Sequence, residues 1–490
     1  MAEAASFPAA DSAAAVRSGG TGRPARRRWL LLAVMAATFV AIMDSFIVNV
    51  ALPSIRADLD ASYAQTELAV AGYVLVYGLL LVTGGRLGDL FGYRGVFLAG
   101  LALFTAASLA CGLAPTPEFL VAARVVQAAG AALFYPQVLS VLQTAFTGSA
   151  RTRAFSVFGA TIGLASVAGQ LVGGALVSAD LFGLSWRPIF LINIPVGVAT
   201  LLLAAAVLPA ARAAARPGLD LCGVALLSAA LLLVSVPLVQ GQAAGWPLWA
   251  WGMLLLAVPG FVSFAVWERR LAGAGGLPLL PPSLFRLPGF TAGTVLALVF
   301  FAGNAGLFFV LTLHLQGGMG YSPLAAGLTF TPLAVAFVAA SLLAPRIQER
   351  VGPRVLVLGY AVNAAGTLML LGCALAFDAG LSGWIMAPAL AAVGFGEGLG
   401  VSPLFGAVLA HVPRSDAGAA SGVVETTTQI GMSFGVTVLG LVFAVGLEAG
   451  AGPAASATAF TAALVGNLVL AAAALALAPA VLRGRRAATG

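Results

Sequence analysis

The sequence predicts an all-α protein that crosses a lipid membrane many times. Of its 490 residues, 61% are hydrophobic and 8% are charged, and the mean hydropathy is +1.03. Soluble proteins carry about 25% charged residues. The apolar residues form continuous runs of about the length of a membrane helix, without the alternation of a membrane β-strand. These observations exclude a soluble enzyme and a nucleic-acid-binding protein, despite the net charge of +7.

Fourteen apolar runs are long enough to span a bilayer, with boundaries good to a few residues. The runs are Trp29–Leu52, Thr66–Gly84, Val96–Leu113, Leu120–Thr144, Phe155–Val177, Ile189–Leu208, Leu221–Val239, Trp249–Trp267, Thr291–Gln316, Leu324–Leu343, Val355–Phe377, Trp384–Leu409, Gly418–Gly446 and Ala459–Leu482. Their connectors are short, so no additional soluble domain is expected.

Arginine placement sets the expected orientation. All 24 basic residues are arginine, and positive residues collect on the cytoplasmic side of membrane proteins. With the N-terminus in the cytoplasm, 21 arginines fall on that side, and only Arg56 and Arg187 fall in the connectors opposite. We therefore expect both termini to be cytoplasmic, in a bacterial plasma membrane. Residues 1–28 are expected to form a disordered tail and residues 483–490 a second cytoplasmic tail.

Several kinds of chemistry have no residues to support them. The chain has no lysine, which removes the phosphate-binding lysine of a P-loop ATPase. Three distant cysteines, none in a CxxC pair, and two histidines predict neither a disulfide framework nor a zinc or haem site. No nucleophile–base pair is evident, so an enzyme is not expected.

Two connectors carry the same pattern 260 residues apart. They contain Arg86, Asp89, Gly92 and Arg94, and Arg346, Glu349, Gly352 and Arg354. Four matches in one register predict two related halves. We expect six-helix bundles at residues 29–208 and 291–482, with two further membrane helices and a cytoplasmic linker inserted at 209–290. Transporters built from such repeats hold their substrate between the halves, near the bilayer midplane.

Six short motifs occur in order along the chain. They are Met43–Pro53 (MDSFIVNVALP), Gly85–Arg94 (GRLGDLFGYR), Arg124–Gly130 (RVVQAAG), Trp186–Pro195 (WRPIFLINIP), Gly320–Pro323 (GYSP) and Ala417–Gly422 (AGAASG). Together they resemble the major facilitator superfamily over nearly the whole chain, and in detail its fourteen-span drug:proton antiporters. The resemblance implies the fold of that superfamily, a small-molecule substrate, a proton gradient as the energy source, no cofactor or metal, and a monomer.

The resemblance also implies roles for two motifs. The connector around Asp89, with its repeat around Glu349, would be a cytoplasmic gate whose charge pairs stabilise the state closed to the cytoplasm. The fifth-helix motif of the antiporters is matched by Gly169, Gln170, Gly173 and Gly174, with Gln170 where the family has proline. Loss of that proline restores a backbone N–H and removes the source of a kink.

Four ionisable residues lie inside apolar runs, namely Asp44, Arg124, Glu397 and Glu425. Placing each of them at the centre of a bilayer costs roughly 2.5–3.5 kcal/mol, and residues that carry such a cost usually have a function, so each is a functional candidate. Burial disfavours a charged carboxylate, so Asp44 is predicted to exchange a proton for a cationic substrate, or else to make a packing hydrogen bond. Arg124 stays charged; it could hold a carboxylate ionised, bind an anionic group, or form a structural ion pair.

Further residues are candidates for a coupling or substrate site. Glu397 lies among alternating glycines that let helices approach closely, and Glu425 shares a helix face with Gln429. The last two candidates are the polar residues Asn49, in the same run as Asp44, and Gln127, in the same run as Arg124. Tyr73 and Tyr77 could line a substrate path or simply pack. His314, near a helix end, is expected to be interfacial.

The sequence therefore predicts a proton-coupled exporter of small amphipathic drugs or antibiotics, cationic or zwitterionic because carboxylates outnumber arginine inside the spans. The expected partners are the substrate, protons and the bilayer, with no nucleic acid. One alternative is an exporter of an anionic or neutral antibiotic that uses Arg124 as counter-charge. Another is a non-transporting membrane receptor or scaffold.

Overall fold

The computed structural model describes residues 24–61, 63–209, 220–241, 244–410, 412–448 and 453–487, and every regular element within these ranges is helical. The N-terminal half comprises α2 (Pro24–Asp58), α3 (Tyr63–Phe91), α4 (Tyr93–Gly112), α5 (Pro117–Ala145), α6 (Gly148–Ala179), α7 (Pro188–Leu191) and α8 (Asn193–Val207). The inserted pair is α9 (Leu221–Gln240) and α10 (Leu248–Gly273). The C-terminal half comprises α11 (Pro288–Leu313), α12 (Pro323–Thr329), α13 (Thr331–Val351), α14 (Val355–Phe377), α15 (Gly383–Val408), α16 (Ala417–Glu448) and α17 (Pro453–Ala487).

Among the described residues, thirteen helical segments are long and apolar enough to cross a membrane. One of them, Thr331–Phe377, consists of α13 and α14, which meet at the short turn Gly352–Arg354. Counted separately, these two helices bring the number to the fourteen spans expected from the sequence. The predicted fold class, an all-α polytopic membrane protein, is confirmed.

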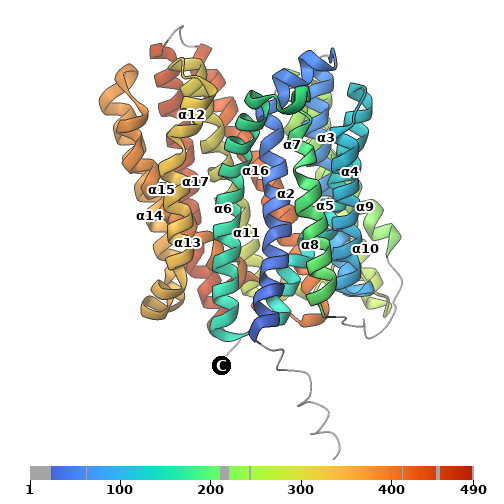
Figure 1. The fold of residues 1–490 in the computed structure, drawn as a ribbon. Coiled ribbons are helices and arrows are strands. Elements are labelled where there is room, and N and C mark those ends of the chain that lie inside the picture. The colour runs from blue at the N-terminus through green and yellow to red at the C-terminus, as the bar shows by residue number, and fades with distance from the viewer. Residues whose placement is uncertain are drawn as a thin grey trace, which may run out of the picture.

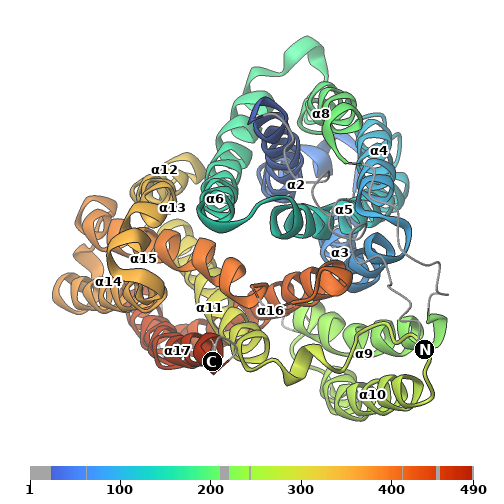
Figure 2. The same ribbon diagram turned by 90° about the horizontal axis from the view of Figure 1, so that it is seen from below.

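The two halves stand side by side as separate helical bundles (Figure 1). Helix α16 packs against α3 and α5 of the N-terminal half, and α6 packs against α13 and α15 of the C-terminal half. The inserted helices α9 and α10 lie beside the bundles (Figure 2), where α9 contacts both α3 and α16. The hydroxyl of Thr437 on α16 donates a hydrogen bond to the carbonyl of Leu238 on α9 (2.9 Å). The inserted pair therefore covers one edge of the interface between the halves.

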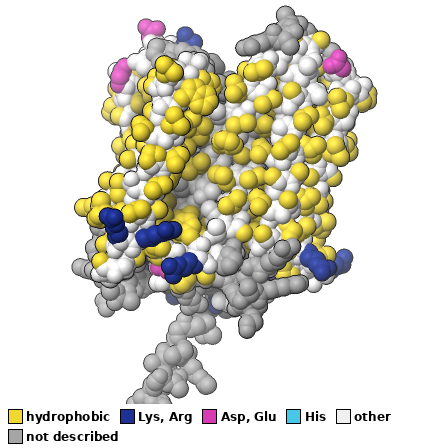
Figure 3. Space-filling view, turned by 180° about the vertical axis from the view of Figure 1, so that it is seen from behind, with side chains coloured by type: hydrophobic (Ala, Val, Ile, Leu, Met, Phe, Trp, Pro, Cys, Tyr) yellow, Lys and Arg dark blue, Asp and Glu magenta, His cyan; other side chains and the backbone are white. Residues whose placement is uncertain are grey.

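The two ends of the bundle differ in shape and charge. Helix α2 begins and α17 ends at the lower end in Figure 1. Most of the arginine side chains visible in Figure 3 gather near this end, which we call the arginine-rich end. At the opposite end a notch separates the two lobes (Figure 3). The halves are thus in contact at the arginine-rich end and apart at the other.

Both repeated connectors contain a glycine with positive φ. Gly92, which directly precedes α4, has φ 90°, and Gly352, at the turn between α13 and α14, has φ 64°. L-residues with a side chain rarely adopt such angles, so both positions favour glycine.

The structure moves three of the predicted boundaries. Helix α2 begins at Pro24 and α17 continues to Ala487, so part of each predicted tail is helical; residues 1–23 and 488–490 lie outside the described residues. The tenth run was predicted at residues 324–343, but the helix breaks at Phe330 and α13 extends to Val351. Pro332 explains the break, because it has no N–H to continue the preceding helix.

Candidate functional site

Asp44 lies at the centre of a buried polar cluster inside the N-terminal half. One of its oxygens accepts a hydrogen bond from Arg124 Nη1 (2.6 Å). The other accepts from Gln127 Nε2 (2.9 Å) and Asn193 Nδ2 (2.7 Å). Gln127 also donates to the Ser108 hydroxyl (2.8 Å). These residues come from α2, α4, α5 and α8, and we call the five of them the N-half polar centre.

The guanidinium of Arg124 is held on several sides. Its Nη1 also donates to Gln127 Oε1 (2.7 Å), and its Nε donates to the carbonyl of Ala69 (3.3 Å). The guanidinium carbon lies 4.0 Å from the ring centroid of Tyr73, a cation–π contact. Asp44 and Arg124 are both fully buried. The sequence left three roles open for Arg124, and this geometry fits the structural ion pair with Asp44.

A row of tyrosines runs from Arg124 towards the other half. Tyr73 stacks on Tyr77 (5.9 Å between ring centroids), and Tyr77 meets Tyr135 edge to face (6.1 Å). Both Tyr77 and Tyr135 interact electrostatically with Glu425 of α16. The row therefore links the N-half polar centre to a carboxyl group of the C-terminal half.

Glu425 differs from Asp44 in its surroundings. Its side chain is 3% exposed, and its Oε1 atom has no hydrogen-bond partner in the described part of the chain. The neighbouring Thr426 hydroxyl donates to the Gly78 carbonyl of α3 (3.3 Å), so this turn of α16 lies against the N-terminal half. One turn further on, Gln429 lines a small cavity between α3, α9 and α16. A buried ionised carboxylate without a partner is costly, which makes Glu425 a group suited to binding a proton or a cation.

Glu397 lies in a second polar cluster, inside the C-terminal half. Its carboxyl group on α15 interacts with the Asn304 side chain on α11. Asn363 of α14 and Asn467 of α17 line the same small cavity. We call these four residues the C-half polar centre. In the described part of the chain, no cluster of three or more histidine, cysteine or acidic residues could hold a metal.

Asp89 contacts the opposite half through the backbone rather than through an arginine. Its carboxylate accepts hydrogen bonds from the N–H groups of Gly418 and Ala419 (both 2.8 Å) and from the Tyr93 hydroxyl (2.9 Å). Gly418 and Ala419 lie in the first turn of α16, where free N–H groups and the helix dipole favour an anion. Asp89 of α3 therefore caps a helix of the other half.

Close backbone packing surrounds this cap. A Cβ atom on Gly85 would collide with the Gly418 carbonyl oxygen, and one on Gly422 would lie 2.6 Å from the Leu81 carbonyl oxygen. Nearby, the Ser140 hydroxyl of α5 lies 3.4 Å from the Ser421 hydroxyl of α16. Glycine at these positions lets α3 and α16 touch at the arginine-rich end.

The remaining connector residues are not arranged symmetrically. Arg86 is buried and interacts electrostatically with Asp89 and Asp416, and Arg94 donates to the Ala205 carbonyl of α8 (2.7 Å). In the C-terminal half, by contrast, the side chains of Arg346, Glu349 and Arg354 are exposed. The connector around Asp89 therefore contacts the opposite half across the interface. The charged residues of the connector around Glu349 lie at the surface.

The glycines of the fifth-helix motif pack α6 against α2. A Cβ atom on Gly169 would lie 2.8 Å from the Met43 carbonyl oxygen, and one on Gly173 would lie 2.8 Å from Ile47. Gly174 follows directly in α6. The motif therefore supports the turn of α2 that carries Asp44. The side chains of Asn49 and Gln170 lie outside the described residues.

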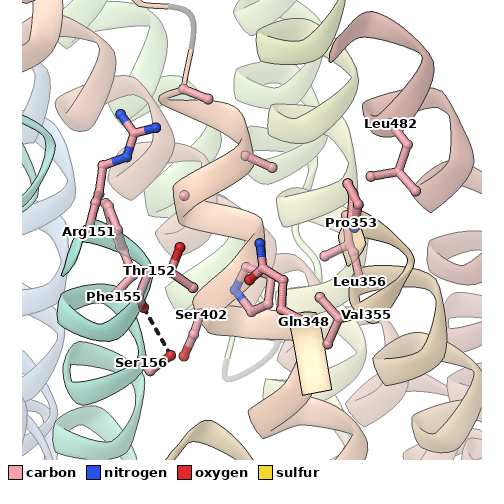
Figure 4. A pocket seen from close by; sticks show the side chains of 14 residues that line it. Arg151, Thr152, Phe155, Ser156, Gln348, Pro353, Val355, Leu356, Ser402 and Leu482 are labelled. Atoms are coloured by element: carbon pink, nitrogen blue, oxygen red, sulfur yellow. Dashed lines mark hydrogen bonds between the residues drawn. The ribbon is translucent and has the colours of Figure 1, made fainter. Parts of the chain in front are cut away.

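A pocket of about 60 Å³ lies where α6 meets α13, α14 and α15 (Figure 4). Arg151, Thr152 and Ser156 line it from α6, and Gln348 and Ser402 line it from the C-terminal half. Drug-sized ligands need roughly 300–1,000 Å³. The pocket is therefore a gap in the interface rather than a substrate site.

Two residues with structural roles were not among the candidates from the sequence. Asn193 donates a hydrogen bond to Asp44. Its position within the apolar run Ile189–Leu208 is the signal that could have identified it. Asp58, at the end of α2, accepts hydrogen bonds from Arg187 Nη1 (2.6 Å) and Trp186 Nε1 (3.0 Å). Burial raises the pKa of Asp58, but the hydrogen bonds from Arg187 and Trp186 outweigh burial, so its pKa lies below the ordinary value.

Comparison with known proteins supports the resemblance seen in the motifs. Residues 34–436 match the sequence profile of the Major Facilitator Superfamily. A "Probable actinorhodin transporter" of Streptomyces coelicolor is 41% identical over 86% of this chain and 73% of its own length. The "Cephamycin export protein CmcT" of Amycolatopsis lactamdurans is 38% identical over 87% of each chain. The crystal structure of the human organic anion transporter MFSD10 (TETRAN) superposes with a TM-score of 0.63 at 16% identity, covering 92% of this chain and all of that one, which shows a common fold.

Proposed function

Because this chain belongs to the major facilitator superfamily and is therefore a membrane transporter rather than an enzyme, we propose that it exports an antibiotic or related drug in exchange for protons. A bacterial relative named as a cephamycin export protein supports the direction, and that relative and the probable actinorhodin transporter support the class of substrate. We further propose a monomer in the bacterial inner membrane, with both termini in the cytoplasm and no bound cofactor.

We assign the exchange of proton and substrate to Glu425. The observation that carries this assignment is the carboxyl group of Glu425, which is buried, has Oε1 unpartnered within the described residues, and interacts electrostatically with Tyr77 and Tyr135. A buried carboxylate with aromatic rings in its vicinity suits an organic cation or the cationic end of a zwitterion. A proton and such a cation compete for one negative charge, and this competition is the basis of antiport.

Asp44 serves this mechanism as a positioning residue. Within the described residues its hydrogen-bond partners all belong to the N-terminal half. A proton on Asp44 would remove the negative charge that compensates the buried Arg124 guanidinium, which is costly. Its charge fixes Arg124 against Tyr73, at the end of the tyrosine row that reaches Glu425. The sequence favoured Asp44 as the carrier; the contacts favour Glu425.

Exchange requires that Glu425 face the two sides of the membrane in turn. The cap of Asp89 on α16 closes the arginine-rich end, which we take as cytoplasmic, and the notch opens towards the outside. In this state a proton binds Glu425 and the substrate leaves. When the cap opens, substrate from the cytoplasm displaces the proton. An anionic or neutral substrate bound by Arg124 is less favoured, because Asp44, Ala69 and Tyr73 already enclose the guanidinium.

The experiment is uptake of an organic cation such as ethidium into proteoliposomes with an acidic interior. We expect a pH gradient to drive uptake by the wild type, Glu425→Gln to abolish gradient-driven uptake, and the control Glu349→Gln, at an exposed carboxylate, to retain it. Gradient-driven uptake that persists in Glu425→Gln would contradict the assignment. Selective inhibition by organic anions would favour Arg124, and no flux of any solute would favour a receptor or scaffold.

A further inference from the structure

The C-half polar centre is built on the same four helices as the N-half polar centre. Counted within each half, these are the first, third, fourth and sixth spans: α2, α4, α5 and α8 in one half, and α11, α14, α15 and α17 in the other. Asp44 and Asn304 are 260 residues apart, the same displacement that relates the two connectors. Each half therefore holds one buried polar cluster at an equivalent place.

The two centres differ in how their charge is balanced. In the N-half polar centre the carboxylate of Asp44 is paired with the guanidinium of Arg124 (2.6 Å). In the C-half polar centre the carboxyl group is that of Glu397, and none of the residues that line its cavity is arginine or histidine. The positive charge supplied by a side chain in one half has no counterpart in the other.

Two amide side chains of the C-half polar centre also lack partners. Asn363 and Asn467 are 8% and 3% exposed, and within the described residues neither side chain makes a hydrogen bond, although both line the cavity. Buried polar side chains nearly always have partners. Gly303 leaves room for this arrangement, because a Cβ atom there would lie 3.0 Å from Asn467 Oδ1. Both amide groups are therefore free to bind a small ligand in the cavity.

The chemistry of the cavity limits what that ligand can be. Carboxylate and amide oxygens are ligands for hard cations. The free volume is about 10 Å³, which is close to the space that one water molecule needs. A single carboxyl group balances a single positive charge, and a small cavity favours the smaller alkali ions.

We propose that the C-half polar centre binds one sodium ion, held by Glu397 and by the amide oxygens of Asn304, Asn363 and Asn467. The ion takes the electrostatic place that Arg124 has in the other half. It satisfies the two unpartnered asparagines and neutralises Glu397 within the bundle. The inference does not depend on the proposed function, because binding is measured on purified protein without transport.

The test compares sodium chloride with choline chloride at constant ionic strength, using the full chain in detergent. The readouts are equilibrium binding of radioactive ²²Na⁺ and the melting temperature. We expect saturable ²²Na⁺ binding and a sodium-dependent rise in melting temperature, both lost in Glu397→Gln. Asn467→Ala, which keeps the carboxyl group, should weaken binding about tenfold or more. Glu349→Gln, the same chemical change at an exposed carboxylate, should bind sodium as the wild type does.

Two results would overturn the proposal. The first is an equal melting temperature in sodium and choline with no bound ²²Na⁺, which would leave Glu397 as a proton-binding group only. The second is unchanged sodium binding in folded Asn467→Ala and Asn363→Ala protein. Should Glu397→Gln fail to fold, the two asparagine variants still decide the outcome.

Discussion

The carboxylate of Asp89 on α3 accepts a hydrogen bond from the backbone N–H of Gly418 on α16, at 2.8 Å and across the interface between the halves. A second bond, from Ala419, is equally short. The two residues that meet are 329 positions apart in the chain. An acidic residue near the end of α3 thus caps a helix in the other bundle, and it ties the closed state to the first turn of α16.

Removal of this charge should open the arginine-rich end. Hydrogen bonds to a charged acceptor contribute roughly 1.5–3 kcal/mol, so Asp89→Asn should raise the ratio of open to closed molecules about tenfold or more. The measurement is thiol labelling of Ser421→Cys, which faces Ser140 across the interface, after the exposed Cys222 is replaced by serine. Labelling should be faster in Asp89→Asn. Glu349→Gln, at the matching position of the repeat, should leave it unchanged, and equal rates in all three proteins would refute the cap.

The close approach of α3 and α16 gives a steric prediction. Alanine at Gly85 would place a Cβ atom against the backbone of Gly418, and overpacking of this kind costs roughly 1–3 kcal/mol. Gly85→Ala should therefore populate the open state and slow transport. Gly95→Ala is the matched control, because a Cβ atom there meets nothing within 4 Å. Equal transport rates and equal labelling rates of Ser421→Cys in the Gly85→Ala and Gly95→Ala proteins would contradict this prediction.

The Asp44–Arg124 pair should behave as a buried ion pair in a double-mutant cycle. Loss of one partner leaves a buried charge uncompensated, at a cost of about 3–5 kcal/mol. Asp44→Asn and Arg124→Met should each lower the free energy of unfolding by this order. The double variant should be destabilised by much less than the sum of the two. Unfolding of the four proteins in mixed micelles measures the coupling, and additive effects would contradict a direct pair.

Asp58 predicts a pH dependence of stability. Hydrogen bonds from Arg187 and Trp186 outweigh the effect of burial and keep the pKa of Asp58 below 3.8 in the folded protein. A lowered folded pKa means that the stabilisation is present above the unfolded value and is lost as the pH falls through the folded value. The pair is partly exposed, so about 0.2–1 kcal/mol is expected. The difference in melting temperature between wild type and Asp58→Asn should be present at pH 7 and shrink below about pH 4; a gap that widens on acidification would be inconsistent.

Much of the fold was predictable because a bilayer imposes simple rules. Apolar runs of sufficient length become helices, since each must satisfy its own backbone hydrogen bonds in lipid. In the described part of the chain thirteen such segments are present, one of which consists of α13 and α14. Interruptions within the helices were harder to predict. Pro332 interrupts the helix near Phe330, and mean hydropathy does not reveal such a proline.

The candidate charges were also visible in the sequence, but their partners were not. Asp44 and Arg124 stand out as ionisable groups in apolar runs, yet they are 80 residues apart, and their pairing depends on which helix faces meet. His314 was expected at the membrane interface, and its contacts within the protein were not predicted. It is buried, bonds Ser456 through Nδ1 (2.9 Å) and stacks on Phe460, because α17 covers the end of the ninth span.

The central claim is that the carboxyl group of Glu425 exchanges a proton for the substrate. Its most direct test is proton release from purified protein in weakly buffered detergent, followed with a pH indicator as ethidium is added. The account predicts release on binding by the wild type and by Glu349→Gln, and none by Glu425→Gln. Undiminished proton release from folded Glu425→Gln would contradict it.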